Sequence, residues 1–152
     1  MLSLLCNVIL NIVFYCPSGL TTAGPAVPHI SYYYSGGFMT IKEMQEVLDA
    51  KFLYGEELED LDVEFVFSAD MMSDVLAYGS KCSVLITGLC NPQVVRTAEM
   101  LDIVCIIFVR GKMPDENMLA LAMGKGIAVL ATDHYMFTTC GMLYEHGLRG
   151  GA

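Results

Sequence analysis

Three times between residues 63 and 134, an apolar run of strand length ends in a short polar turn, and a helical pattern begins directly after it. The mainly apolar runs cover residues 63–67, 83–86 and 127–131, and the turns begin at Ser68, Thr87 and Thr132. A fourth run, 104–109, is apolar at every position. Strands without polar alternation need cover on both faces, which parallel sheets obtain from the helices that connect their strands. The pattern therefore predicts an α/β fold.

The remaining segments follow the same alternation of strands and helices. Thr40–Glu43 has the sequence of a capping box that opens a helix with an apolar face. Strands are predicted at 51–54, 63–67, 83–87, 104–109 and 127–131. Further helices are predicted at 70–78, 92–101, from Pro114 to Gly124, and at 134–145. We expect a three-layer α/β/α domain with a largely parallel or mixed sheet of about five strands.

The first 38 residues differ in character from the rest of the chain. Residues 1–41 contain no Lys, Arg, Asp or Glu, so all 8 basic and 17 acidic residues lie from Lys42 onward. Residues 36–39 can be encoded by a bacterial ribosome-binding sequence followed by a start codon, which makes Met39 a candidate first residue. A secretory signal or anchor and a genuine extension are the alternatives, although a signal peptide usually begins with positive residues. We expect a non-domain leader at 1–38 and one domain at 39–149.

Charge and spacing exclude several classes of function. A net charge of −9 repels phosphate backbones, so nucleic acid is not an expected partner. The apolar run at 1–15 is shorter than the roughly 20 residues that span a bilayer, so no membrane partner is expected. The sequence has neither CxxC spacing nor a GxxxxGK[ST] phosphate loop. We therefore expect no cofactor, no metal site and a reducing, cytoplasmic setting, with the acidic residues of 56–64 forming a solvated loop.

Methionines and isolated cysteines are expected to fill the core, because both side chains pack as adaptable hydrophobes. The cysteines of the domain are Cys82, Cys90, Cys105 and Cys140. The methionines are Met71, Met72, Met100, Met118, Met123, Met136 and Met142.

Residues 68–77, 85–98, 106–112, 126–133 and 141–148 together resemble the DRTGG-domain family, especially its small stand-alone members. The Asp-Arg-Thr-Gly-Gly signature itself is absent, and Ser68-Ala69-Asp70 stands in its place. The family is similar in fold to the N-terminal domain of HPr kinase/phosphorylase, and it accompanies CBS domains in regulated pyrophosphatases. The resemblance implies a regulatory domain without catalytic activity that forms a homodimer or docks on a regulatory partner protein.

Polar residues of the turns are the candidate binding residues, because the carboxyl ends of parallel strands rim the ligand crevice of α/β folds. They are Ser68, Asp70, Ser73, Thr87, Asn91, Arg110, Thr132 and Asp133. The alternative interpretation is structural, since these residue types also serve as helix caps and turn formers, and arginines often form surface ion pairs.

Two functions follow from these interpretations. The domain is either a sensor of a small anionic metabolite or nucleotide at the strand ends, or an assembly module that needs no ligand. An enzyme is a third and weaker alternative, because the sequence offers no clear pair of nucleophile and base.

Overall fold

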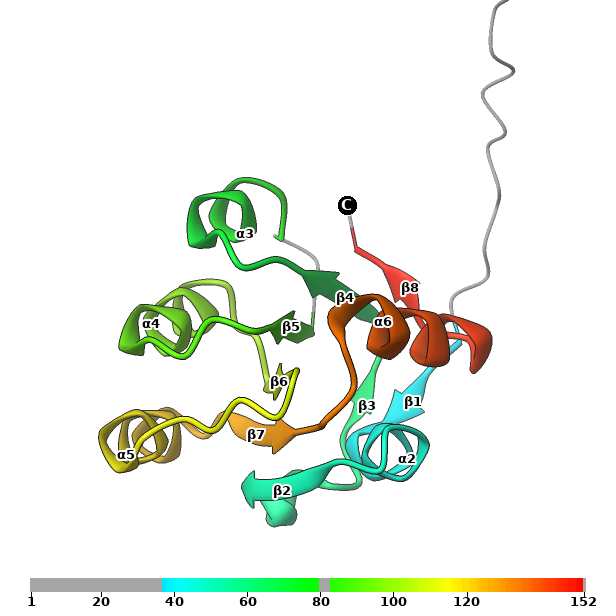
Figure 1. Ribbon diagram of the computed structural model, residues 1–152, viewed down its shortest axis with the longest axis horizontal. Helices are drawn as coiled ribbons and strands as arrows, with labels where there is room; N and C mark the ends of the chain where they lie inside the picture. Colours follow the sequence, from blue (N-terminus) through cyan, green and yellow to red (C-terminus); the bar gives the residue numbers. More distant parts are fainter. Residues whose placement is uncertain (1–36, 80–82, 152) are drawn as a thin grey trace, which may run out of the picture. The chain divides into compact units, whose positions relative to one another are not determined.

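The computed structural model describes residues 37–79 and 83–151, and the predictions for the leader and for Cys82 lie mostly or wholly outside this part of the chain. The strands are β1 (Met39–Thr40), β2 (Lys51–Tyr54), β3 (Asp62–Val63), β4 (Phe65–Ser68), β5 (Val84–Thr87), β6 (Cys105–Phe108), β7 (Ala128–Ala131) and β8 (Arg149–Gly150). The helices are α2 (Ile41–Val47), the 3-10 helix η1 (Glu56–Leu58), α3 (Met72–Tyr78), α4 (Pro92–Met100), α5 (Glu116–Lys125) and α6 (Met136–Glu145). Figure 1 shows their arrangement.

Six strands form the main sheet, in the order β2-β7-β6-β5-β4-β8. Strands β4 to β7 lie side by side and parallel, β8 is parallel to β4, and β2 is antiparallel to β7 at the other edge. The register pairs Thr87 with Phe108 and Phe108 with Ala131, so the carboxyl ends of β5, β6 and β7 reach the same edge of the sheet. We call this side, where the carboxyl ends of the parallel strands lie, the carboxyl edge, as distinct from the outer strands β2 and β8.

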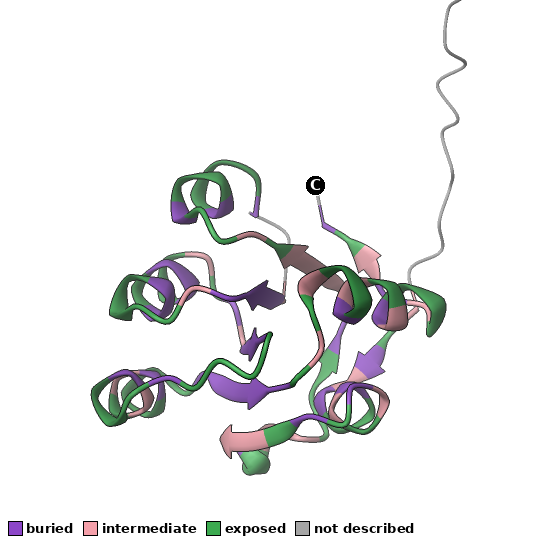
Figure 2. Ribbon diagram, in the orientation of Figure 1, coloured by how far each residue is buried: buried purple, intermediate pink, exposed green. Residues whose placement is uncertain are grey.

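Helices cover both faces of this sheet, which confirms the predicted three-layer α/β/α architecture. Helices α3, α4 and α5 lie on one face, and α2 and α6 lie on the other (Figure 1). Neighbouring residues of β6 show why the strand is apolar throughout, because Ile106 packs into the core beside α4 and α5 while Ile107 packs into the core beside α2 and α6. The buried residues accordingly concentrate in the central strands (Figure 2).

The sheet has six strands where about five were expected, and one predicted strand is divided. The predicted strand 63–67 separates at Glu64, with β3 pairing to β1 in a small second sheet and β4 entering the main sheet. Strand β8 was not predicted because it has two residues and neither apolar alternation nor an apolar run.

The N-termini of three helices show which of the predicted helix starts are formed. The capping box is confirmed, because the Glu43 amide donates to Thr40 Oγ1 at 3.1 Å and the Thr40 amide donates to Glu43 Oε2 at 2.8 Å. Asp115 caps α5 by accepting from the Met118 amide, so Pro114 lies before the helix and does not begin it. Helix α6 begins after Tyr135 without a side-chain cap.

Methionine burial differs from the expectation. Met72 and Met118 are buried, whereas the exposed fractions of Met71, Met100 and Met123 are 61%, 71% and 56%. In α3 only Met72 and Val75 are buried, because this helix lies near the end of the helical layer and has a helical neighbour, α4, on one side only (Figure 1).

No helix in the described ranges is long and apolar enough to cross a membrane.

Candidate ligand site at the carboxyl edge

The turns after four adjacent parallel strands meet at the carboxyl edge. The turn after β4 carries Asp70, the turn after β5 begins at Thr87 and Gly88, and the turn after β6 carries Arg110. The turn after β7 begins at Thr132. Because neighbouring strands are about 4.8 Å apart, side chains of successive turns are within reach of one another.

Asp70 ties three of these turns together. Its Oδ1 accepts hydrogen bonds from the Gly88 amide at 2.7 Å and from Thr87 Oγ1 at 3.1 Å. Its Oδ2 accepts from Arg110 Nη2 at 2.8 Å. We call Asp70, Thr87, Gly88 and Arg110 the Asp70 cluster. Asp70 and Thr87, which were predicted to lie on one rim, are in contact, and Arg110 forms the ion pair that the alternative interpretation gave it.

The Asp70 cluster favours the ionised carboxylate. Partial burial alone raises the pKa of Asp70, but the hydrogen bonds from Gly88, Thr87 and Arg110, together with the charge of Arg110, outweigh this effect and lower the pKa below its ordinary value of 3.8. Asp70 is therefore negative at neutral pH, and it orients a positive Arg110.

Gly88 gives Arg110 its position. A Cβ atom on residue 88 would lie 1.7 Å from Arg110 Nη2, so the guanidinium rests directly against the Gly88 backbone. Any larger residue at this position would displace the arginine. The sequence contains the glycine, but it gives no sign that a side chain from another turn needs the space.

The crevice between β6 and β7 is closed by backbone hydrogen bonds. The helix after β6 lies on one face and the helix after β7 on the other, which is the arrangement that opens a crevice in many α/β folds. Here the Arg110 amide donates to the His134 carbonyl at 2.8 Å, and the Gly111 amide donates to the Thr132 carbonyl at 3.0 Å. Both Arg110 and Gly111 have positive φ, at 66° and 63°. A cavity of only about 40 Å³ remains beside Gly111, Thr132 and Asp133.

The other predicted site residues lie outside the Asp70 cluster. Thr132 Oγ1 donates to the Leu48 carbonyl at 2.9 Å, and Asn91 caps α4 by accepting from the Gln93 amide at 2.9 Å. Asn91 is therefore the helix cap that the alternative interpretation gave, and Thr132 is a turn former as well, because its Oγ1 accepts from the His134 amide at 3.3 Å. Ser73 is exposed on α3, and Ser68 lines a separate cavity between β4 and α6.

Positive charge gathers near Cys90 in the turn after β5. Partial burial is the largest influence on the Cys90 thiol and raises its pKa, while Lys112 and Arg110 lower it by a smaller amount. Both cations therefore lie close enough to this turn to act on it. Cys90 is exposed, so the expectation that it fills the core is wrong, whereas Cys105 is buried as expected.

Large apolar side chains are also exposed in these turns and at the start of α6. The exposed fractions are 61% for Met71 after β4, 58% for Met113 after β6, and 71% and 90% for Tyr135 and Phe137 after β7. These residues and Lys112 were not among the predicted site residues. Met71, Tyr135 and Phe137 lie within predicted helices, where apolar residues were assigned to the core.

The DRTGG domain family model matches residues 43–146, which is more than half of the chain. The chain belongs to the DRTGG domain family. The resemblance that the sequence analysis noted is thereby confirmed, and the matched range contains every residue of the Asp70 cluster.

A solved structure supports this DRTGG fold. The domain is similar to a crystal structure of the CBS and DRTGG domains in the regulatory region of a Clostridium perfringens pyrophosphatase, which was solved as a complex with its activator, diadenosine tetraphosphate. The TM-score is 0.54 and the sequence identity 22%, over 66% of this chain and 44% of the other. The present chain thus spans less than half of that regulatory region. No curated protein gives a significant match.

The Asp70 cluster offers charge and hydrogen bonds for the recognition of a ligand. Within the described residues, no group of three His, Cys, Asp or Glu side chains is placed to hold a metal ion. The burial that raises the pKa of Cys90 also keeps this exposed thiol protonated at neutral pH. A cation held in place by a carboxylate is suited to binding an anion.

Proposed function

We propose that this DRTGG domain, residues 39–149, is a non-catalytic regulatory module that binds a small anionic metabolite of the nucleotide class at its carboxyl edge. The observation that carries the proposal is the hydrogen bonding and exposure of the Arg110 side chain. Among the described residues, Asp70 is the one hydrogen-bond partner of its guanidinium, and 39% of its side chain is exposed. A guanidinium has five N–H donors, so Arg110 can keep Asp70 and still bind a phosphate or carboxylate.

Lys112 supplies a second cation for the same ligand. It is exposed, it acts on Cys90 together with Arg110, and it has no ion pair among the described residues. Two neighbouring cations are unusual on a chain with a net charge of −9, so they form a local exception to its acidic surface. Anionic ligands are attracted to such a local region of positive charge.

Exposed aromatic rings favour a nucleotide over a simple anion. Tyr135 and Phe137 follow β7, and the carbonyl of His134 beside them accepts the hydrogen bond from the Arg110 amide. Aromatic side chains stack on bases with a gain of about 1–3 kcal/mol per base. The nucleotide in the pyrophosphatase complex is bound by a distant relative, and it supports the class of ligand proposed here without locating a site.

Calorimetric titration with diadenosine tetraphosphate, ATP, AMP and adenosine tests the proposal. We expect affinity to increase with the number of phosphates and to fall about tenfold or more in Lys112→Gln, because losing a cation near phosphate costs on the order of 1.4 kcal/mol. Lys125→Gln is the matched control, because Lys125 pairs with Glu99 at the far end of α5. Equal losses in both variants, or no binding by any of the four compounds, would contradict the proposal.

A homodimer is the second candidate function, and the exposed apolar side chains of the carboxyl edge favour it. Met71, Met113, Tyr135 and Phe137 would lose contact with water if this edge docked on a second copy. Sedimentation equilibrium would then show a dimer that Phe137→Ser dissociates. Tyr78→Ser is the control because Tyr78, 65% exposed, ends α3 away from this edge. A wild-type monomer that binds nucleotide would exclude assembly as the function of this edge.

We place the module in the cytoplasm. Cys90, Cys105 and Cys140 are all free thiols, although Cys90 is exposed. Free cysteines are typical of a reducing compartment.

A further inference from the structure

Strand β2 is an outer strand of the main sheet, and one of its two sides is open (Figure 1). It pairs with β7 on its inner side. Among the described residues, no other strand or loop forms a backbone hydrogen bond with Lys51–Tyr54. Alternate residues of an outer strand direct their N–H and C=O groups away from the sheet. The outer side of β2 can therefore accept a further strand.

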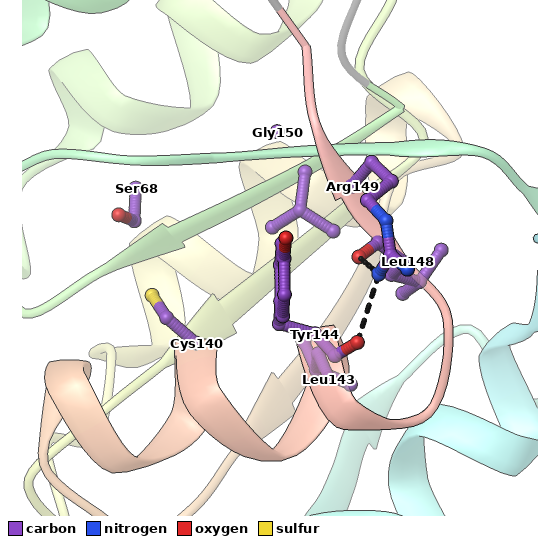
Figure 3. A pocket seen from close by; sticks show the side chains of 8 residues that line it. Ser68, Cys140, Leu143, Tyr144, Leu148, Arg149 and Gly150 are labelled. Atoms are coloured by element: carbon purple, nitrogen blue, oxygen red, sulfur yellow. Dashed lines mark hydrogen bonds between the residues drawn. The ribbon is translucent and has the colours of Figure 1, made fainter. Parts of the chain in front are cut away.

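The opposite outer strand, β8, offers a much shorter edge. It has two residues, and Nη1 of its Arg149 donates to the Tyr144 carbonyl of α6 at 2.8 Å (Figure 3). Strand β2 has four residues. Proteins commonly bind an extended peptide by adding it as a strand to an open edge of a sheet. Of the two outer strands, β2 is the one suited to this mode of binding.

A cavity lies along β2 and the turn that follows it. It has a volume of about 230 Å³ and is lined by residues 52–57. Phe52 and Tyr54 are half-buried and supply aromatic walls, whereas Glu56 and Glu57 are exposed. A guanidinium stacks on aromatic rings and also pairs with carboxylates. Rings and carboxylates in one cavity therefore suit an arginine side chain.

The turn after β2 is fixed by contacts of its own chain. Gly55 has a φ of 91°, and a Cβ atom there would lie 2.7 Å from the Ala128 Cα, so the turn packs directly against the start of β7. The Tyr54 hydroxyl donates a hydrogen bond to the Glu57 carboxylate. The carboxylates are thus held beside β2 before a partner binds, which lowers the entropic cost of binding.

The charge around β2 selects a basic partner. Six acidic residues lie within 54–64, and this segment contains no Lys or Arg. Within the described ranges, Glu59 is the one member of the six that forms an ion pair, with Lys42. A second copy of this chain would offer Lys51 of its own β2 against six carboxylates, so self-pairing leaves most of the negative charge uncompensated. A basic segment compensates it.

We infer that β2 is a docking edge for an extended, arginine-containing segment of a partner protein. The backbone of that segment pairs with the outer side of β2, and one arginine side chain enters the cavity lined by residues 52–57. There it stacks on the aromatic rings and pairs with Glu56 and Glu57. The inference does not rest on the proposed nucleotide site, because the lining of this cavity excludes the Asp70 cluster.

Titration of the full chain with short synthetic peptides tests the inference. The probe is an end-capped, fluorescent hexapeptide in which valine alternates with arginine, and fluorescence anisotropy measures its binding. One control peptide has glutamate in place of arginine, and the other keeps arginine but is N-methylated at every residue. We expect both controls to bind about tenfold more weakly or worse, because one lacks the opposite charge and the other lacks the backbone donors.

Protein variants test the part of the two carboxylates. The double variant Glu56→Gln/Glu57→Gln should weaken binding of the arginine peptide about fivefold, as expected for the loss of two exposed ion pairs. The matched control is Asp74→Asn/Glu145→Gln, which makes the same change in net charge at exposed residues of α3 and α6. This control should bind the peptide as the wild type does.

Amide hydrogen exchange locates the bound peptide. Saturating peptide should slow exchange in Lys51–Tyr54 and leave Arg149–Gly150 of the opposite outer strand unchanged. Equal binding of the glutamate or N-methylated peptide, equal weakening in both double variants, or no protection in β2 would overturn the inference. A dimer that the peptide dissociates would also overturn it, because β2 would then pair with a second copy. A failed nucleotide titration leaves these results unaffected, since the two sites share no residue.

Discussion

Gly88 leaves the space that the Arg110 guanidinium occupies in the proposed ligand site. A methyl group there would occupy the place of the Arg110 guanidinium. Because a guanidinium at the end of a flexible side chain can move aside, Gly88→Ala should cost about 0.2–1 kcal/mol of stability, the usual value of an exposed ion pair. In an Arg110→Ala background the same substitution should cost nothing further. Urea denaturation of the four variants measures this coupling.

Gly124 provides the matched control for Gly88. It lies within α5 and has no atom within 4 Å of the position where a Cβ would be added. Gly124→Ala should therefore stabilise the domain by about 0.5–1 kcal/mol, since alanine restricts the unfolded chain and favours helix. A loss of stability in both glycine variants would show that the clash with Arg110 is not the cause at Gly88.

The titration of Asp70 gives a second prediction at the scale of the residue. Its pKa is lower in the folded state, so its ionised form adds stability above the unfolded-state pKa and loses that contribution as pH falls through the folded-state pKa. Wild type should exceed Asp70→Asn in stability at neutral pH, and the difference should shrink below pH 3.8, the ordinary value. Urea denaturation across a pH series measures it. A difference that stays constant down to the acid limit contradicts the described hydrogen bonds.

At the scale of elements, the hydroxyl of Thr132 joins the end of β7 to the end of α2. It is buried and donates to the Leu48 carbonyl. Thr132→Val keeps the shape but leaves that carbonyl without its donor, which should cost about 1–3 kcal/mol. Calorimetric or urea unfolding measures the loss.

Thr139 in α6 is the contrasting case. Its hydroxyl is also buried, but it has no hydrogen-bond partner among the described residues. Thr139→Val should be neutral or stabilising, because it removes a polar group that burial disfavours. Equal destabilisation by both valine variants would mean that side-chain shape, and not the hydrogen bond to Leu48, matters at residue 132.

The elements also show what local sequence can predict. The strands β5, β6 and β7 and the capping box at Thr40 were predicted because each depends on residues close together in the chain. The break at Glu64 and the pairing of β8 depend on partners far away in the sequence, such as Met39 and Phe65. Periodicity alone does not contain that information.

The candidate site was also only partly predictable from local sequence. The contact between Asp70 and Thr87 follows from parallel strand order, so turn positions were enough to predict it. The hydrogen bond from Thr132 to the Leu48 carbonyl and the capping of α4 by Asn91 depend on side-chain direction, which turn position does not determine. The exposed rings of Tyr135 and Phe137 were missed because apolar residues were assigned to the core.

For the whole molecule, we propose that ligand recognition takes place at the carboxyl edge of the DRTGG domain. Two cations, Arg110 and Lys112, act on Cys90 at the carboxyl edge, and an apolar cavity lies at the β4–β8 edge beside Tyr144. Cys105, between them in the core, is buried, which raises its pKa and keeps its thiol neutral. The central claim is that the carboxyl edge binds the anion.

Amide NMR with increasing diadenosine tetraphosphate tests that claim most directly. The account predicts that the signals of Gly88, Cys90 and the 110–112 turn shift in a saturable way, because these amides lie in the turns beside the two cations. The signals of 124–126, where α5 ends at the opposite edge, should stay in place. Saturable shifts confined to 124–126, or no shifts at all, would contradict it.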